Sequence, residues 1–145
     1  MPGSANDIAI GANGEVFIVS TLSVVGGYAV KQWKNNQWKV VPGRGALRIA
    51  VSSIGIPWAV DNANKVLKLS GQTMLDTGGF GRDIAAGDVG YMYVIRQTPV
   101  GGGYSVKKYE NGCWFQLSGG GVAITAHGFD GEPVIINNLG MIAEY

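Results

Sequence analysis

The sequence predicts an all-β fold, and its internal repetition favours a β-propeller built from four blades. Residues 83–121 repeat residues 7–45 without a gap, and 15 of the 39 aligned positions are identical. The turn glycines Gly14, Gly55, Gly90 and Gly131 recur at spacings that alternate between longer and shorter. No segment shows a sustained helical period. A repeat of this size cannot bury its own apolar face, so it must stack on its neighbours.

The chain divides into two long and two short units, and each long unit is followed by a short one. The step from Gly14 to Gly90 equals the step from Gly55 to Gly131, and we call this step the repeat offset. The length of the chain suits one compact domain. We therefore predict a single propeller domain over residues 1–145, with repeats at residues 6–45, 46–81, 82–121 and 122–145.

Turn residues place the strands within each unit. In the first unit, Asn13-Gly14 predicts a hairpin, because Asn-Gly is favoured where both central residues need a positive φ. Gly26-Gly27 leads into a third strand, and a turn at Asn35-Asn36 leads into a fourth. The corresponding turn of the third unit is Asn111-Gly112. The sequence thus predicts about four short antiparallel strands in each unit.

Apolar runs indicate how the units stack. Residues 16–19 and 92–95 are continuously apolar, which predicts that the second strand of each long unit is covered on both faces. The third strand alternates, with Tyr28 and Val30 on one face and Lys31 on the other. Covered inner strands and partly wet outer strands are typical of a propeller blade.

The last unit is shorter than the others. It stops at Tyr145, the position that matches Leu69, and therefore lacks a fourth strand. Residues 1–5 offer a short segment that could complete it, since natural proteins usually cover an open strand edge. Three arrangements fit this pattern: a closed ring of four blades, two chains joined in a larger ring, or chains added end to end.

The repeat phrases DIAIGANGEVFIVS, GGYAVKQW and RDIAAGDVGYMYVI resemble tectonin-type β-propeller repeats, as found in tectonin and tachylectin-like lectins. Such repeats run from a D-I-x-x-G strand to a tryptophan that shortly precedes Pro-Gly. Trp38 with Pro42-Gly43 matches this pattern, and Trp114 with Gly119 matches it without the proline. The second unit has residues 73–75, Thr-Met-Leu, where the tryptophan would stand. The resemblance implies four tectonin-like blades and glycan binding.

Composition excludes several classes of partner. The net charge is +1 and no basic run exists, which argues against binding to nucleic acid. No apolar run approaches the roughly 20 residues that span a bilayer, and the N-terminal MPGSAND lacks the features of a signal peptide. We expect a soluble protein, either cytoplasmic or exported by a non-classical route. Cys113 is the only cysteine and is predicted to be a small apolar filler beside Trp114.

The sequence predicts no catalytic residue, metal site or cofactor. His127 is the only histidine, and a general base needs a tuned partner and a nucleophile within reach. Asp7 and Asp83 are separated by the repeat offset, so they are predicted to accept a repeated structural hydrogen bond. Residues 61–64 alternate oxygen-bearing side chains but lack the glycine and distant glutamate of a calcium loop, which favours a simple turn.

Aromatic residues beside amides are the candidate ligand-binding groups, because an aromatic face suits the apolar side of a sugar and amides suit its hydroxyls. Trp38 and Trp114 recur at equivalent positions, which favours a packing role for both. Positions that differ between the halves are more informative. The candidates are Trp33, Trp58, Tyr109, Asn36 and Asn62.

These observations predict a non-catalytic binding module, first of all a lectin-like propeller that recognises a glycan or glycoconjugate. The alternative is a structural protein that self-associates into a homo-oligomer, or polymerises, through its incomplete last blade, the open strand edge and the N-terminal segment. An enzyme is not expected.

Overall fold

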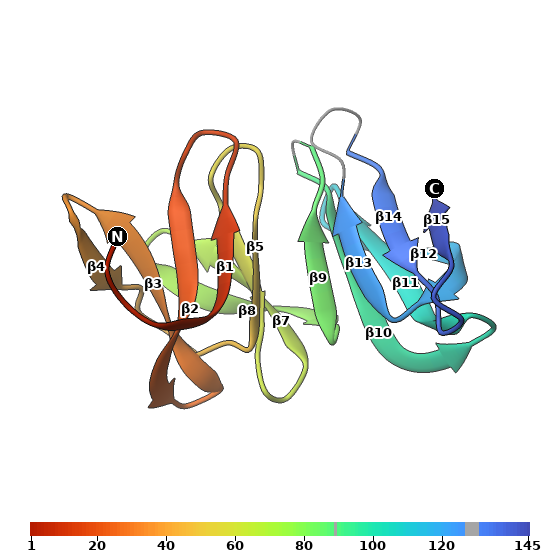
Figure 1. The fold of residues 1–145 in the computed structure, drawn as a ribbon, viewed down its shortest axis with the longest axis horizontal. Helices are drawn as coiled ribbons and strands as arrows, with labels where there is room; N and C mark the ends of the chain where they lie inside the picture. The colour runs from red at the N-terminus through yellow and green to blue at the C-terminus, as the bar shows by residue number, and fades with distance from the viewer. Residues whose placement is uncertain (89, 127–130) are drawn as a thin grey trace.

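The computed structural model describes residues 1–88, 90–126 and 131–145, and these form four antiparallel sheets (Figure 1). Blade 1 contains β1 (Ala5–Ile10), β2 (Val16–Val24), β3 (Gly27–Lys34) and β4 (Gln37–Val40). Blade 2 contains β5 (Arg48–Val51), β6 (Pro57–Val60), β7 (Lys65–Ser70) and β8 (Thr73–Phe80). Blade 3 contains β9 (Asp83–Ala86), β10 (Met92–Val100), β11 (Gly103–Glu110) and β12 (Cys113–Gly121). Blade 4 contains β13 (Ala123–Ala126), β14 (Pro133–Ile136) and β15 (Ile142–Glu144).

The predicted fold class, a four-bladed propeller with a three-stranded last blade, is confirmed. Each sheet is a meander whose strands follow one another in chain order. The first strands of successive blades, β1, β5, β9 and β13, contact one another in that sequence. Figure 1 shows blade 1 with the N-terminus at one end of this row and blade 4 with the C-terminus at the other.

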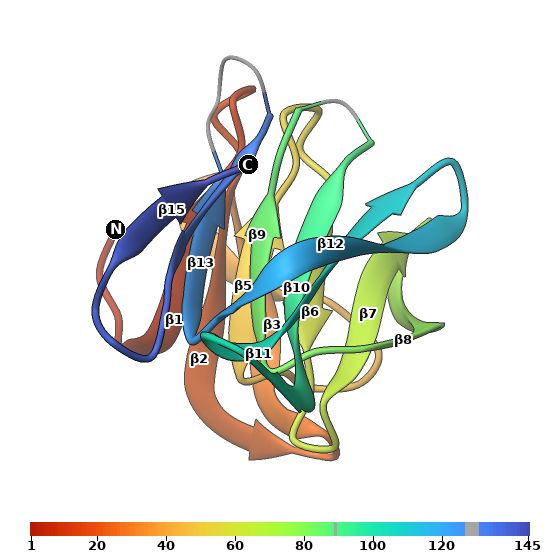
Figure 2. The ribbon, with the colours of Figure 1, turned by 90° about the vertical axis from the view of Figure 1, so that its right-hand side faces the viewer.

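Apolar clusters join each blade to the next. The described residues form three such clusters, one between blades 1 and 2, one between blades 2 and 3, and one between blades 3 and 4. Within that part of the chain, no cluster joins blade 4 back to blade 1. Figure 2, which views the molecule from the blade 4 end, shows the blades behind one another. The four blades therefore form an arc with two end blades.

The turn conformations predicted from the sequence are confirmed in two hairpins and differ in a third. Asn35 and Asn36 join β3 to β4 with φ of 53° and 58°, and Asn111 and Gly112 join β11 to β12 in the same way. The β1–β2 connection was predicted to need two positive φ values, but among the described residues of this turn only Gly14 has one, at 83°. Its N–H donates to the Gly11 carbonyl (2.9 Å), so this hairpin uses a longer loop with a single left-handed glycine.

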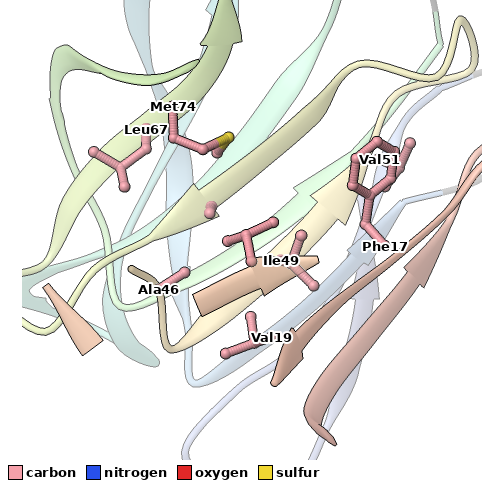
Figure 3. Close-up of a cluster of buried hydrophobic side chains, with 9 residues drawn as sticks. Phe17, Val19, Ala46, Ile49, Val51, Leu67 and Met74 are labelled. Atoms are coloured by element: carbon pink, nitrogen blue, oxygen red, sulfur yellow. The ribbon is translucent and has the colours of Figure 1, made fainter. Parts of the chain in front are cut away.

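The second strand of each long blade is covered on both faces, as predicted. In β2, residues 16–20 are all buried, and in β10 residues 92–95 are buried. Figure 3 shows the blade 1–blade 2 cluster, in which Phe17 and Val19 of β2 share the interior with Ile49 of β5. The outer half of β2 becomes exposed after a register shift that follows Val19.

The Pro-Gly signature of blade 1 has a structural role. The backbone N–H of Met74 in β8 donates to the Pro42 carbonyl (3.0 Å), and Gly43 forms a bridge with Met74. A Cβ at Gly43 would lie 2.8 Å from the Met74 carbonyl oxygen, and φ of this glycine is 115°. Only glycine permits this close approach, so the exit of blade 1 is docked on the outer strand of blade 2.

Asp7 and Asp83 accept the repeated hydrogen bonds that their spacing predicts. Asp7 Oδ2 accepts from the backbone N–H of Ile49 in β5 (2.9 Å), and Asp83 Oδ2 accepts from the N–H of Ile124 in β13 (3.2 Å). Each carboxylate thereby links a long blade to the short blade that follows it. Arg48 lies between the two, 3.1 Å from Asp83 and 4.0 Å from Asp7. This set of bonds fixes the register between blades 1, 2, 3 and 4.

We expect Asp83→Ala to lower the free energy of unfolding by about 1–3 kcal/mol, because the half-buried Ile124 N–H loses its acceptor and Arg48 loses the nearer of its two carboxylate partners. Asp83→Asn keeps one acceptor oxygen and should lose less. Urea denaturation of both variants measures the difference. Equal stability of the alanine variant and the parent chain would show that Asp83 does not link the blades.

The N-terminal segment packs on its own first blade. Trp38 Nε1 in β4 donates to the Pro2 carbonyl (2.8 Å), so residues 1–4 run across blade 1 before β1 begins at Ala5. Of the arrangements that the sequence left open, completion of the last blade by residues 1–5 of the same chain is therefore not seen. The reason is distance, since the two ends of the arc carry these two segments.

Two further sequence interpretations can be compared with the structure. Cys113 is exposed at the start of β12, so the prediction of an apolar filler is wrong, because the turn at Asn111-Gly112 projects it beyond the packed part of the blade. His127 lies outside the described residues. None of the described segments forms a helix with the length and apolarity needed to cross a membrane.

Tyr145 attaches the last blade to blade 3. Its hydroxyl donates to the Ser118 carbonyl, and burial raises the pKa of this hydroxyl above its ordinary value of 10.0. Because the folded pKa is raised, the stabilisation is present below about pH 10 and is lost as the pH rises through the folded pKa.

The stability of the parent chain should therefore fall more steeply above about pH 10 than that of Tyr145→Phe, as measured by urea midpoints. Parallel curves would contradict this role.

Candidate functional site

The structure distributes the five predicted ligand-binding residues over three places: Trp58 with Tyr109, Trp33 with Asn36, and Asn62. Trp58 is 3% exposed, and its ring packs edge to face on Tyr109 with centroids 4.9 Å apart. Tyr109 in turn packs on Trp114 at 5.1 Å. Lys68 Nζ lies 5.0 Å from the Trp58 ring centroid and covers it further. Trp58 therefore offers no exposed face to a ligand, and the stack of three rings belongs to the interior between blades 2 and 3.

Trp33 and Asn36 lie on the β3–β4 hairpin at the outer end of blade 1. The Trp33 ring is half-buried and packs edge to face on Trp38 with centroids 5.0 Å apart. Asn36 is exposed at the tip, where its φ of 58° is part of the turn. Trp33 thus keeps part of its surface free, and a polar amide lies near it on the same hairpin.

Asn62 lies in the β6–β7 turn, which follows the strand that contains Trp58. Its side chain is exposed, while its backbone N–H donates to the Gly26 carbonyl (2.9 Å). The turn is organised by Asp61, which is 0% exposed and accepts from the N–H groups of Ala63 and Lys65, both at 2.8 Å. This agrees with the predicted turn, because the Asp61 oxygens are used within it.

Asp61 also carries a buried charge, and the chain supplies a partner for it. Arg44 Nη2 lies 2.7 Å from Asp61 Oδ2. In the second half of the protein, Asn137 takes the place of Asp61 and accepts from Leu139 and Met141, both at 2.9 Å, while Gly120 takes the place of Arg44. The carboxylate and the guanidinium are therefore present together or absent together, as expected when a buried charge needs a partner.

The candidate site that the sequence did not predict is a groove between the outer parts of blades 1 and 2, here called the blade 1–blade 2 groove. It encloses about 450 Å³. Strands β3 and β4 form one wall, and the end of β7 with its turn forms the other. Its lining consists of Gln32, Lys34, Lys39, Val40, Val41, Pro42, Leu69, Gly71 and Gln72.

Charge distinguishes this groove. Among the described residues, neither Lys34 nor Lys39 takes part in an ion pair, and both side chains are exposed. Gln32 Nε2 donates to Glu15, which orients that amide along one wall. The floor is apolar, from Val41 and Leu69. The groove therefore combines a basic rim with amides and an apolar base.

A signal for the groove was present in the sequence. The repeat offset takes Lys34 to Glu110 and Lys39 to Phe115, so neither of these two lysines is repeated in the second half. The ligand-binding residues were predicted from aromatic positions that differ between the two halves of the chain. The groove is instead marked by charged positions that differ between the halves. The contribution of Gln72 could not be predicted, since it comes from a different blade.

The described residues contain no group of three or more His, Cys, Asp or Glu side chains that could hold a metal ion. The acidic residues placed near one another, Asp7 and Asp83, accept backbone hydrogen bonds and approach Arg48. They lie at the inner strands and away from the groove. The arrangement in the groove is suited to binding by charge and hydrogen bonds rather than to proton transfer.

We expect Trp58→Ala to lower the free energy of unfolding by about 3–5 kcal/mol, because it removes a fully packed ring from the blade 2–blade 3 interior. Trp33→Ala should cost clearly less, since that ring is only half-buried. Urea denaturation of the two variants tests the assignment of Trp58 as a packing residue. A smaller loss for Trp58→Ala than for Trp33→Ala would refute it.

No family model and no curated protein matches the chain. Solved structures do match. One, described as YCF48 bound to D1 peptide, superposes with a TM-score of 0.68 at 14% identity over 99% of this chain and 50% of the other. This likeness shows the propeller fold alone. The chain thus spans about half the length of the solved protein that it matches.

Proposed function

We propose that this chain is a non-catalytic binding module that holds an acidic, extended peptide segment of a partner protein in the blade 1–blade 2 groove. The propeller fold supports a binding or scaffold role. The observation that carries the choice of ligand is the pair of exposed lysines without an ion pair, Lys34 and Lys39, above an apolar floor in the described part of the chain.

The chemistry of the groove fits a peptide. An extended chain presents backbone N–H and C=O groups that the amides of Gln32 and Gln72 can bond. Aspartate or glutamate side chains, or a terminal carboxylate, would pair with the lysine ammonium groups. Apolar side chains would contact Val41 and Leu69. The structure described as YCF48 contains a bound peptide, which supports peptide binding by a propeller of this kind.

Glycan binding, the function that the sequence resemblance implies, is the second candidate. Its support is Trp33, whose half-buried ring keeps part of its surface exposed near Asn36. The other aromatic candidates favour it less, since Trp58 is buried and Tyr109 is stacked between two rings. A sugar platform on blade 1 would lie on the opposite face of β3 from Gln32, so the two candidate sites are separable by mutation.

We expect a library of displayed random peptides, selected on the purified chain, to yield sequences rich in aspartate and glutamate. Their affinity should fall at least tenfold in the double variant Lys34→Glu, Lys39→Glu, because two attractive charges become repulsive. Both side chains are exposed, so the variant should keep the stability of the parent chain. Titration calorimetry with one selected peptide measures the change.

The matched control is Arg96→Glu, a charge reversal in a separate basic hollow on blade 3. It should leave the affinity for the peptide unchanged. Equal losses in both variants would indicate non-specific charge attraction and contradict the groove. Binding to a glycan array that Trp33→Ala abolishes, together with no enriched peptides, would favour the second candidate.

A further inference from the structure

The last blade ends in an exposed apolar surface, which we call the blade 4 end face. It is the side of blade 4 turned away from blade 3, and it includes Val134, Ile136 and Ile142. Ile142 is 74% exposed. These side chains line an apolar hollow of about 350 Å³ together with Ala123, Ile124 and Thr125. Contiguous apolar surface of this kind marks an interaction site in a folded protein.

Blade 1 ends in a second apolar surface, which we call the blade 1 end face. It contains Ile8 and Ile10 of β1 with Trp33 and Trp38. Ile8 and Ile10 are 58% and 62% exposed, whereas Ala9 between them points into the blade 1–blade 2 cluster. Each end of the arc therefore presents a sheet face with exposed apolar side chains, although Val16 and Ile18 on the blade 1 end face are themselves buried.

The interior of the molecule already contains an interface of the same composition. Blade 2 contributes Trp58, Val60 and Val66 to the blade 2–blade 3 cluster, and blade 3 contributes Ile84, Met92, Val94, Tyr109 and Trp114. The residues that follow the blade 2 set by one repeat offset are Val134, Ile136 and Ile142. The residues that precede the blade 3 set by one repeat offset are Ile8, Val16, Ile18, Trp33 and Trp38. The two end faces are thus the two halves of a repeated interface.

Differences between the interfaces compensate one another in volume. Val134 stands where blade 2 has Trp58, which leaves the blade 4 end face hollow. On the blade 1 end face, Ile10 stands where blade 3 has Ala86, and Trp33 stands where it has Tyr109. Larger side chains on blade 1 therefore match a smaller one on blade 4, as dense packing across an interface requires.

We propose that two copies of this chain pair head to tail, with the blade 4 end face of each on the blade 1 end face of the other, to close a ring of eight blades. Two copies would supply eight blades and about the length of the solved structure on which the four blades superpose, because this chain covers 50% of that chain. Eight lies within the usual range of about four to eight blades. Two such contacts related by a two-fold axis leave no end face exposed.

The N-terminal segment gives this pairing a defined register. Residues 77–80 end β8, and a Cβ at Gly79 would lie 2.6 Å from Trp114 Cζ2. Gly3 precedes Gly79 by the repeat offset and makes the same approach to Trp38, 3.2 Å from Nε1. Residues 1–4 thus occupy the place of a preceding blade's fourth strand. By the Lys65↔Phe80 pairing, Ser4 of one copy would lie opposite Met141 of the other.

We expect light scattering of the purified chain to give twice the chain mass of 15.2 kDa. Ile142→Asp and Ile10→Asp should each give monomers with unchanged secondary structure by circular dichroism, because both side chains are exposed within one chain. The matched control is Leu139→Asp, at a 77% exposed residue in the β14–β15 turn outside the end face, and it should stay dimeric.

Mixing the two monomeric variants shows whether they are monomeric because an interface is disrupted or because they fold incorrectly. The mixture contains one interface with both aspartates and one with neither, so an equimolar mixture should form a heterodimer although each variant alone does not. In a Cys113→Ser background, the double variant Ser4→Cys, Met141→Cys should form a disulfide-linked dimer on oxidation.

Several results would overturn the proposal. A monomer at every concentration tested, or a dimer that persists in Ile142→Asp, would show that the end faces do not pair. Failure of the mixed variants to associate would have the same meaning. Polymers longer than two copies would show that the ring does not close at eight blades.

Discussion

The structure depends on one constraint, which is that the sheet of a blade has two apolar faces and can cover neither by itself. Phe17 and Val19 of β2 are buried because blade 2 covers the face of blade 1 on which they lie. The internal blades 2 and 3 satisfy the constraint on both sides. Each end blade satisfies it on one side, so exposed isoleucines at both ends of the arc follow directly from the architecture.

Carboxylates complement this apolar packing where one inner strand meets the next. Asp7 and Asp83 each accept from an N–H group of the following short blade, and Arg48 is placed between them. Apolar contact is non-directional, whereas a hydrogen bond to one N–H fixes the position of one strand relative to its neighbour. A buried carboxylate needs a cationic partner, as Asp61 illustrates. Asp61 forms an ion pair with Arg44, and both residues are replaced in the second half.

The same packing determines where a ligand can bind. Aromatic side chains that look suitable for a sugar are largely used between blades, as the stack of Trp58, Tyr109 and Trp114 shows. Long polar side chains remain at the outer rim, where blades 1 and 2 leave the groove in which we propose that a peptide binds. Lys34 and Lys39 lie in this region, and both are replaced at the equivalent positions of the second half.

The sequence by itself determined the blades, most of the turns and the bonds of Asp7 and Asp83, because strand periodicity, turn residues and a constant repeat offset are local or repeated properties. Tertiary structure alone decided what covers the faces of the strands whose side chains alternate. Alternation tells which side chains share a face but not what lies opposite, so the burial of Trp58 and the exposure of Cys113 could not be predicted. The groove belongs to this second group, since Gln72 joins Lys39 only when two blades pack together.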